Sequence, residues 1–136
     1  MGLTRDQILQ ADDIAIKEIE VEEWGGVAYI RQLTRGEQDA YMERRFKPSM
    51  SQKGREQQIS STINLFGHDA WLVAQGICDE DGKRLFETKH VKELEKKSGE
   101  VVGRIAKEIL EHSGMKEDVE ELDNDLGDRE EEELKN

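Results

Sequence analysis

Residues 16–33 read IKEIEVEEWGGVAYIRQL, and this stretch places two runs of strand-forming residues around a glycine pair. The first run, IKEIEVEE, is rich in β-branched residues with charges between them, and the second, VAYIRQL, alternates between two faces. Gly25 and Gly26 supply a turn, so the stretch predicts a β-hairpin. The alternation slips between Ile16 and Ile19, which favours a bulge or a shortened first strand.

Two capping-box patterns predict helices on either side of this hairpin. Residues 4–7 (TRDQ) and 34–37 (TRGE) each place a threonine three residues before Gln or Glu, a pairing that satisfies free N–H groups at a helix start. We expect helices over residues 5–11 and 35–46. Residues 47–55, KPSMSQKGR, hold the only proline and are predicted to form a long mobile loop.

Residues 56–78 carry the strongest helical pattern of the chain. Apolar residues recur there at helical spacing, namely Ile59, Ile63, Phe66, Ala70, Val73 and Ile77. Leu65, Trp71 and Leu72 widen the apolar face beyond one stripe. Two internal glycines count against a single straight helix. The pattern therefore predicts a helix with more apolar surface than one packed face requires.

The chain after this helix is predicted to turn and to end its folded part with another helix. Residues 79–83, DEDGK, are typical of a turn with Gly82 in a left-handed conformation. Ser98 is a candidate N-cap for a helix over residues 99–113, and Gly114 is a typical stop signal.

These elements predict an α+β fold. It consists of a mainly helical small domain with an N-terminal β-hairpin over residues 1–114, followed by an acidic tail over residues 115–136. The tail holds 11 acidic residues, three basic residues and no aromatic one. Such a segment cannot bury enough apolar surface to offset the entropy lost on ordering. We therefore expect the tail to be disordered or loosely helical.

The composition excludes several classes of protein. The chain has 136 residues, a net charge of −12 and 38% charged residues. A stand-alone nucleic-acid binder normally carries a basic patch and a high pI. A membrane-spanning helix needs a run of about 18 apolar residues, which this sequence lacks, and a single cysteine cannot form an internal disulfide. We therefore expect an intracellular protein that binds neither nucleic acid nor a membrane.

The sequence shows no recognisable constellation for catalysis or for metal binding. Its three histidines lie far apart, at His68, His90 and His112. Cys78 lacks a nearby helix start or basic cluster that would lower the pKa of its thiol. The DEDGK segment lacks the later oxygen ligands and the central glycine of a calcium loop. We therefore expect no enzyme activity, no cofactor and no metal site.

Three features of the sequence together match one family. The first is a short opening helix followed by IEVEEWGGVAYIRQLTRGEQDAY, and the second is VAQGICDEDGKRLF leading to HVKELEKKSGEVVGRI. The third is the charged end of a chain of this size. Over roughly residues 3–112 the chain resembles the tail assembly chaperones of long-tailed (siphovirus-type) bacteriophages.

This resemblance implies a role without catalysis, in the cytoplasm of the infected bacterial host. Such chaperones bind the long, helical tape measure protein, keep it soluble, and leave as tail tube subunits polymerise, so they are absent from the finished virion. Family members often have a second, longer form made by a programmed frameshift. Many copies are needed to cover one client, which implies self-association and possible contact with the tail tube protein.

A second class of function stays open at this stage. An acidic regulatory interaction protein, such as a DNA mimic, would also carry a high negative charge. However, 11 of the chain's 32 acidic residues, and −8 of its net charge of −12, lie in the tail. A mimic needs carboxylates fixed on a rigid face, so the position of the charge favours the chaperone.

Two sets of residues are candidates for binding a partner. Leu65, Trp71 and Leu72 either bind the client or another copy, or belong to the core. The basic set Arg44, Arg45 and Lys47 begins a run over residues 44–55 with five bases and no acid. This run is either a solvated loop or a contact for an acidic partner, such as the tail of a neighbouring copy.

Overall fold

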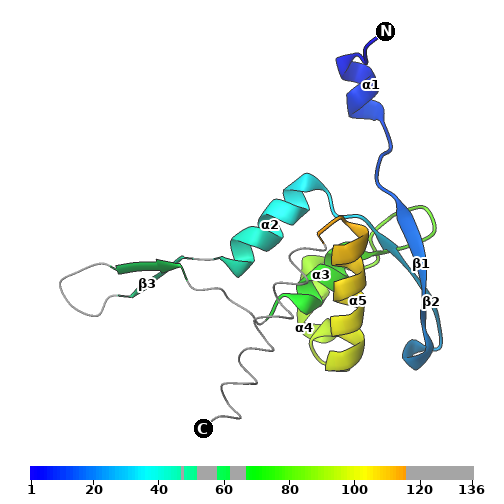
Figure 1. The fold of residues 1–136 in the computed structure, drawn as a ribbon. Helices are drawn as coiled ribbons and strands as arrows, with labels where there is room; N and C mark the ends of the chain where they lie inside the picture. The colour runs from blue at the N-terminus through cyan, green and yellow to red at the C-terminus, as the bar shows by residue number, and fades with distance from the viewer. Residues whose placement is uncertain (47, 52–57, 62–66, 116–136) are drawn as a thin grey trace.

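The computed structural model describes residues 1–46, 48–51, 58–61 and 67–115. A three-stranded antiparallel sheet with the order β1-β2-β5 lies beside the helices, as Figure 1 shows. Its strands are β1 (Ile16–Val21), β2 (Gly26–Arg31) and β5 (Ile77–Cys78). The helices are α1 (Arg5–Gln10), α2 (Arg35–Arg45), α3 (Asp69–Gly76), α4 (Val91–Leu94) and α5 (Gly99–His112). The predicted α+β fold with an N-terminal hairpin is confirmed.

The β1–β2 pair is the predicted hairpin. Its register runs without interruption from Ile16 to Val21 on β1. The 3-10 turn η1 (Glu22–Trp24) and Gly25, at φ +77°, connect the two strands. The expected bulge or shortened strand is wrong, because Ile16 does not have to face the core: it stays 39% exposed, while Ile19 on the opposite face packs against the core.

The capping signals are confirmed as helix boundaries. At both Thr4 and Thr34 the threonine hydroxyl accepts from the third helical N–H, and the Gln or Glu side chain accepts from the threonine N–H. Ser98 accepts a hydrogen bond from the N–H of Val101 at the start of α5. Gly114 follows α5 with a φ of +81°, the left-handed conformation of a typical helix stop.

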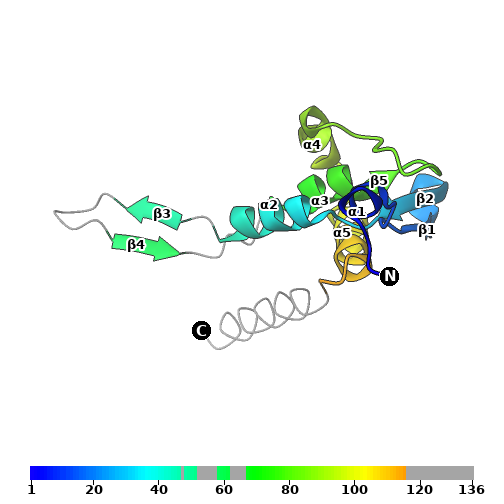
Figure 2. The ribbon, with the colours of Figure 1, turned by 90° about the horizontal axis from the view of Figure 1, so that it is seen from above.

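The helix predicted over residues 56–78 is wrong in extent. Residues Gln58–Ser61 form strand β4, which pairs with β3 (Pro48–Ser51) inside the predicted loop. Helix α3 begins only at Asp69, after Gly67 with a φ of +83°. Periodicity cannot separate a short apolar strand from a helix. Figure 2 shows the β3–β4 pair beyond the C-terminal end of α2, away from the main sheet.

The last two residues of the predicted helix form strand β5, because they pair with a distant strand. Ile77 and Cys78 leave α3 and pair with Ile30 and Tyr29 of β2. The chain then reverses at Asp79–Lys83, where Gly82 has the predicted left-handed conformation with a φ of +87°. The predicted turn is confirmed, and β5 adds a third strand that the sequence pattern did not indicate.

The core lies between α3, α5 and the sheet. Seven of the eight residues of α3 are buried, from Ala70 to Gly76. Helix α5 contributes its apolar stripe, namely Val101, Val102, Ile105, Ala106, Ile109 and Leu110. Met115 also belongs to this core, at 7% exposure, although the sequence pattern placed it in the acidic tail. Figure 2 shows α3 between α4 on one side and α5 on the other.

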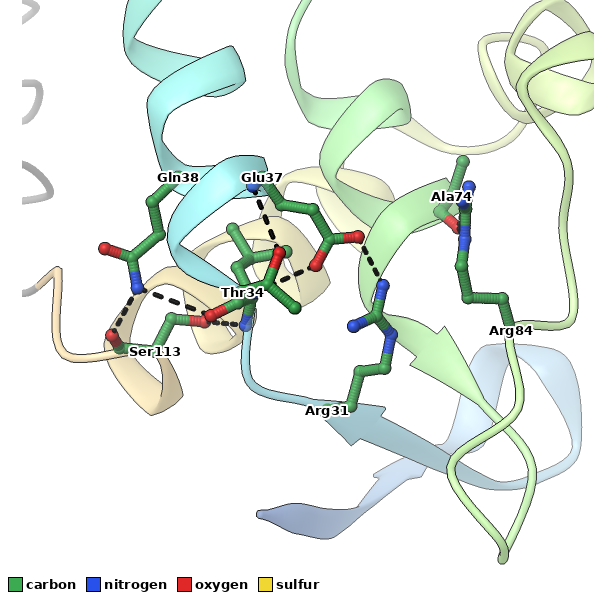
Figure 3. Close-up of polar contacts among 8 residues, drawn as sticks. Arg31, Thr34, Glu37, Gln38, Ala74, Arg84 and Ser113 are labelled. Carbon is green, nitrogen blue, oxygen red and sulfur yellow. Dashed lines mark hydrogen bonds and ion pairs between the residues drawn. The ribbon is translucent and has the colours of Figure 1, made fainter. Parts of the chain in front are cut away.

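A polar network ties the start of α2 to the end of α5 (Figure 3). The N–H of Leu33 donates to the hydroxyl oxygen of Ser113 at 2.9 Å, and the side-chain amide of Gln38 donates to the Ser113 carbonyl at 3.1 Å. Arg31, at the end of β2, donates to the carboxylate of Glu37. Arg31 is only 8% exposed, so this ion pair satisfies a largely buried charge.

We expect this ion pair to make the fold less stable in acid. Burial acts to raise the pKa of Glu37, but hydrogen bonds from Arg31 and Thr34 outweigh it, so the pKa lies below the usual 4.5. A carboxyl group whose pKa is lower in the folded than in the unfolded state stabilises the fold at pH values above its unfolded pKa. This contribution is lost as the pH falls through the folded pKa.

The measurement is the urea midpoint of the wild type and of Glu37→Gln, from about pH 7 down to about pH 3. Glutamine keeps the oxygen that accepts from the N–H of Thr34, but its amide nitrogen replaces the oxygen that accepts from Arg31, so the variant removes the ion pair together with its hydrogen bond. The stability advantage of the wild type should shrink as the pH falls. A stability advantage that stayed constant over this pH range would contradict a stabilising role for the ionised Glu37 carboxylate.

Candidate interaction surface

The apolar candidates from the sequence lie in the core. Leu72 is fully buried and Trp71 is 8% exposed. The guanidinium of Arg44 lies 5.2 Å from the centre of the Trp71 ring. Leu65 falls outside the described residues. In this conformation the apolar face of α3 packs inside the domain, so Trp71 and Leu72 offer little surface to a partner.

The basic candidates Arg44 and Arg45 are the last two residues of α2, and they differ in exposure. Arg44 is exposed, but Arg45 is 1% exposed, with its guanidinium 5.6 Å from the ring of Tyr41 and 5.3 Å from that of Phe46. Arginine is suited to such stacking because its planar charge is weakly hydrated. Arg45 is therefore not available to an acidic partner in this conformation. Lys47 lies outside the described residues.

An open groove of about 380 Å³ runs beside α4, between that helix and the turn of the hairpin. We call it the α4 groove, and its lining residues are Trp24, Phe86, His90, Glu93, Leu94 and Lys97. Its walls are mainly apolar, and its rim carries charges of both signs. A concave apolar surface with a few charged groups is the usual form of a binding site for a side chain or a small ligand.

The hairpin turn brings Trp24 to this groove. Arg104 of α5 donates two hydrogen bonds, of 2.8 and 2.9 Å, to the carboxylate of Glu23 in η1. This contact lowers the pKa of Glu23 to about 2, so the carboxylate stays ionised over the ordinary pH range. The ion pair therefore holds η1 against α5, with Trp24 still 39% exposed.

The opposite wall comes from the segment that leads into α4. The rings of Phe86 and His90 meet edge to face, with their centres 6.0 Å apart. His90 is fixed because its Nδ1 accepts a hydrogen bond of 2.9 Å from the N–H of Glu87. These contacts hold the aromatic wall of the α4 groove in place before any partner binds.

A second groove, of about 230 Å³, lies on the other side of Leu94 and Lys97. Asp69, at the start of α3, contributes to its wall. Burial raises the pKa of Asp69, and the neighbouring His68 opposes that rise. This groove is smaller than the α4 groove, and its walls come from the start of α3, the end of α4 and the start of α5.

The α4 groove is not predicted by the sequence pattern. Trp24 stands directly before the glycine pair of the predicted hairpin turn, and Phe86 follows the predicted turn over residues 79–83. A signal was present, because an aromatic residue in a polar turn has no local reason to be there. Only the tertiary structure places Trp24 and Phe86, 62 positions apart in the sequence, on one groove.

The described residues offer no other site of recognisable chemistry. Within them, His, Cys, Asp and Glu side chains form no group of three or more that could hold a metal ion. No helix in this part of the chain is both long and apolar enough to span a membrane. Cys78 is buried, and this burial raises the pKa of its thiol, which makes it a poor nucleophile.

Comparisons with known proteins give the context for this surface. A family model described as phage tail assembly chaperone matches residues 4–127. The structure of the bacteriophage HK97 tail assembly chaperone is similar, with a TM-score of 0.53 and 23% sequence identity. The similarity covers 78% of this chain and 94% of the HK97 chain, and at that identity it shows the fold. No curated protein matches the sequence significantly.

Proposed function

Since this chain belongs to the phage tail assembly chaperone family, we propose that it binds the tape measure protein of a long-tailed phage and keeps it soluble. The chaperone works in the cytoplasm of the infected host. It leaves when tail tube subunits polymerise around the tape measure protein, and it is absent from the finished virion. The family match over residues 4–127 is the observation that carries this proposal.

The α4 groove is the surface best suited to the client. A tape measure protein is long and helical, so it presents repeated stripes of apolar side chains. An apolar groove recognises such stripes by accepting side chains at helical spacing. Trp24 is the principal anchor, because tryptophan is enriched among the residues that dominate binding energy and Trp24 is 39% exposed at this groove.

The charge of the chain supports the same role. A net charge of −12 keeps each copy in solution, and several copies along a client would keep the coated client in solution too. A client much longer than one 136-residue chain needs many copies, so we propose that the chaperone self-associates along it. The family match also favours this role over that of an acidic regulatory protein such as a DNA mimic.

The test is co-expression of the tape measure protein of the same phage with and without this chain. We expect the chain to raise the soluble fraction of the client and to copurify with it. Replacing Trp24 by serine should weaken the complex by about 10- to 30-fold in Kd, the usual effect of losing an aromatic anchor. The readout is the soluble fraction, followed by a titration of the purified complex.

Ile16→Ser is the matched control, because Ile16 has the same exposed fraction as Trp24, 39%, and lies on the same hairpin at the opposite end. We expect it to leave client binding unchanged. Equal losses in the two variants would exclude the α4 groove as the client site. An unchanged soluble fraction with the wild type would exclude the chaperone role for this client.

A further inference from the structure

Strand β1 lies at the edge of the main sheet and has a strand partner on only one side. Within the described part of the chain the strand order is β1-β2-β5, and β1 pairs with β2 along its whole length. The Gln32 N–H donates to the Ala15 carbonyl, so the backbone groups of Ala15 point toward β2. Because backbone groups alternate in direction along a strand, those of Ile16, Glu18 and Glu20 point away from the sheet. We call this row of free N–H and C=O groups the β1 edge.

The charges of β1 disfavour its pairing with β1 of a second copy. Two identical edge strands pair antiparallel about a two-fold axis perpendicular to the sheet, which places residues from the same face opposite each other. In each register that pairs at least four residues of β1, Glu18 then lies opposite Glu18 or Glu20 of the other copy. Like charges directly opposite each other are destabilising. The β1 edge therefore fits a strand without acidic side chains.

The surroundings of the β1 edge are acidic. Residues 16–23 carry four glutamates and one lysine, a net of −3. Glu18 and Glu20 are exposed on the face of β1 that points away from the core. The negative charge also acts on Tyr29 of β2, whose pKa is raised first by Glu80 and then by burial and by Glu18. Complementary charge steers association, so this edge should select a strand that is flanked by basic residues.

The second sheet, which we call the β3–β4 ribbon, has the complementary properties. Among the described elements, its strands have extensive contacts only with each other. A two-stranded ribbon by itself is at best marginally stable in water. Residues 47–61 carry three bases and one acid, a net of +2, but neither strand contains a charged residue. The ribbon is therefore short of strand partners, and its charge is opposite to that of the β1 edge.

Strand β4 is the part of the ribbon that fits the β1 edge. Strand β3 begins with Pro48, which has no N–H to donate, whereas every residue of β4 has one. Since β4 is uncharged, it brings no like charge against Glu18 and Glu20. The other described strands are less suitable, because β2 is central and β5 has only two residues.

The ribbon cannot reach the β1 edge of its own copy. Figures 1 and 2 both place α2 between the ribbon and the main sheet. Helix α2 has 11 residues, so it is about 16 Å long. Pro48 follows the C-cap residue Phe46 by two positions, which keeps it within about 8 Å of Phe46, and Ser61 stays beside its partner Pro48. This end of the ribbon therefore remains at the end of α2 that points away from the sheet, and β4 can pair only with a second copy.

We propose that β4 of one copy adds as a fourth strand to the β1 edge of another copy. The proposal rests on the self-association in the proposed function and deepens it by naming the two surfaces that meet. The ribbon and the β1 edge lie on opposite sides of one copy, so the contact is head-to-tail. Such a contact can repeat into an open chain of copies, which is the arrangement that a long client needs.

Sedimentation of the full-length chain over a range of concentrations, with no client present, tests the contact. The wild type should self-associate, and Glu18→Pro should weaken association at least about tenfold. Proline is tolerated on an edge strand where its position faces away from the sheet, so the bonds between β1 and β2 remain while an outward N–H is lost. Glu18→Thr is the matched control, because it removes the same carboxylate and keeps the N–H. It should change association by less than about fivefold.

A charge reversal tests the same edge without changing the backbone, and it decides the matter if Glu18→Pro does not fold. Glu18→Lys combined with Glu20→Lys should weaken association at least about tenfold, because the bases of the ribbon then meet bases. Asp39→Lys combined with Glu111→Lys is the matched control, since it makes the same change of charge at exposed positions on α2 and α5. This control should associate at least as tightly as the wild type, because it lowers the overall repulsion between copies.

A spin label then tests which surfaces meet. A nitroxide is attached to Ser60→Cys on β4, and this copy is mixed with an isotope-labelled copy that carries no nitroxide. The label should broaden the amide signals of Glu18 and Glu20 more than those of Ile77 and Cys78 on β5, at the opposite edge of the sheet. The native Cys78 is 1% exposed and should remain unreacted.

A wild type that stays monomeric at all concentrations would overturn the proposal. Unchanged association of the double lysine variant would overturn it too, as would equal broadening at the two edges of the sheet. Because none of these measurements contains a client, their failure leaves client binding at the α4 groove standing. A failure of co-expression likewise leaves the contact between copies standing.

Discussion

Replacing Trp71 by alanine is expected to lower the free energy of unfolding by about 3–5 kcal/mol, the range for a buried tryptophan. The reason is its position: Trp71 is 8% exposed on α3, and it belongs to the main core cluster. A small domain has only about 5–15 kcal/mol of stability in total. The variant should therefore fold only marginally, and a urea titration followed by circular dichroism measures the loss.

The same variant decides between the two roles that the sequence left open for Trp71. Arg44→Ala is the control, because it removes the cation over the ring at 5.2 Å and leaves the ring in place. An exposed contact of that kind contributes about 0.5–1 kcal/mol, so this control should fold almost normally. If Trp71→Ala folded with nearly full stability and still failed to solubilise the client, Trp71 would be a client contact and the core assignment would be wrong.

Gly76→Ala is expected to lower the free energy of unfolding by about 1–3 kcal/mol, the usual cost of overpacking a core. A Cβ at residue 76 would lie 2.4–2.8 Å from three side-chain atoms of Ile109. Ile109 is fully buried on α5, so its branched side chain has no free space to move into. Alanine normally favours a helix over glycine by about 0.5–1 kcal/mol, and here the clash should outweigh that gain.

Gly103→Ala is the matched control, because it makes the same change at another helical glycine. A Cβ at residue 103 would lie 3.6 Å from an oxygen of Asp69, which is ordinary contact. We therefore expect this variant to gain about 0.5–1 kcal/mol. Urea unfolding of both variants checks the opposite signs. A Gly76→Ala variant as stable as the wild type would show that α3 and α5 can separate without cost.

A double variant tests whether Ile109 causes the effect. Ile109→Ala removes all three atoms that a Cβ at residue 76 would meet, and alone it should cost about 2–5 kcal/mol through its cavity. Combined with Gly76→Ala, it should cost less than the sum of the two single variants, because the new methyl group occupies part of the cavity. Strict additivity would contradict direct contact between these positions.

The local elements were within reach of the sequence because they depend on near neighbours. The capping boxes at Thr4 and Thr34, the hairpin around Gly25 and the left-handed Gly82 each follow from hydrogen bonds or backbone angles within a few residues. All four are present in the structure. The family resemblance also came from the sequence, and the family match confirms it.

Tertiary contacts decided the remainder. Ile77 and Cys78 continue a helical apolar pattern, yet they form β5 because Tyr29 and Ile30 of β2 offer strand partners. Trp71 and Leu72 looked like surplus apolar surface, yet both are buried, because contacts on both sides of a helix cannot be read from its own periodicity. The α4 groove likewise requires the hairpin turn to meet a distant segment. Near-neighbour chemistry therefore determined where most elements begin and end, and packing between distant residues determined which surfaces remain free to bind.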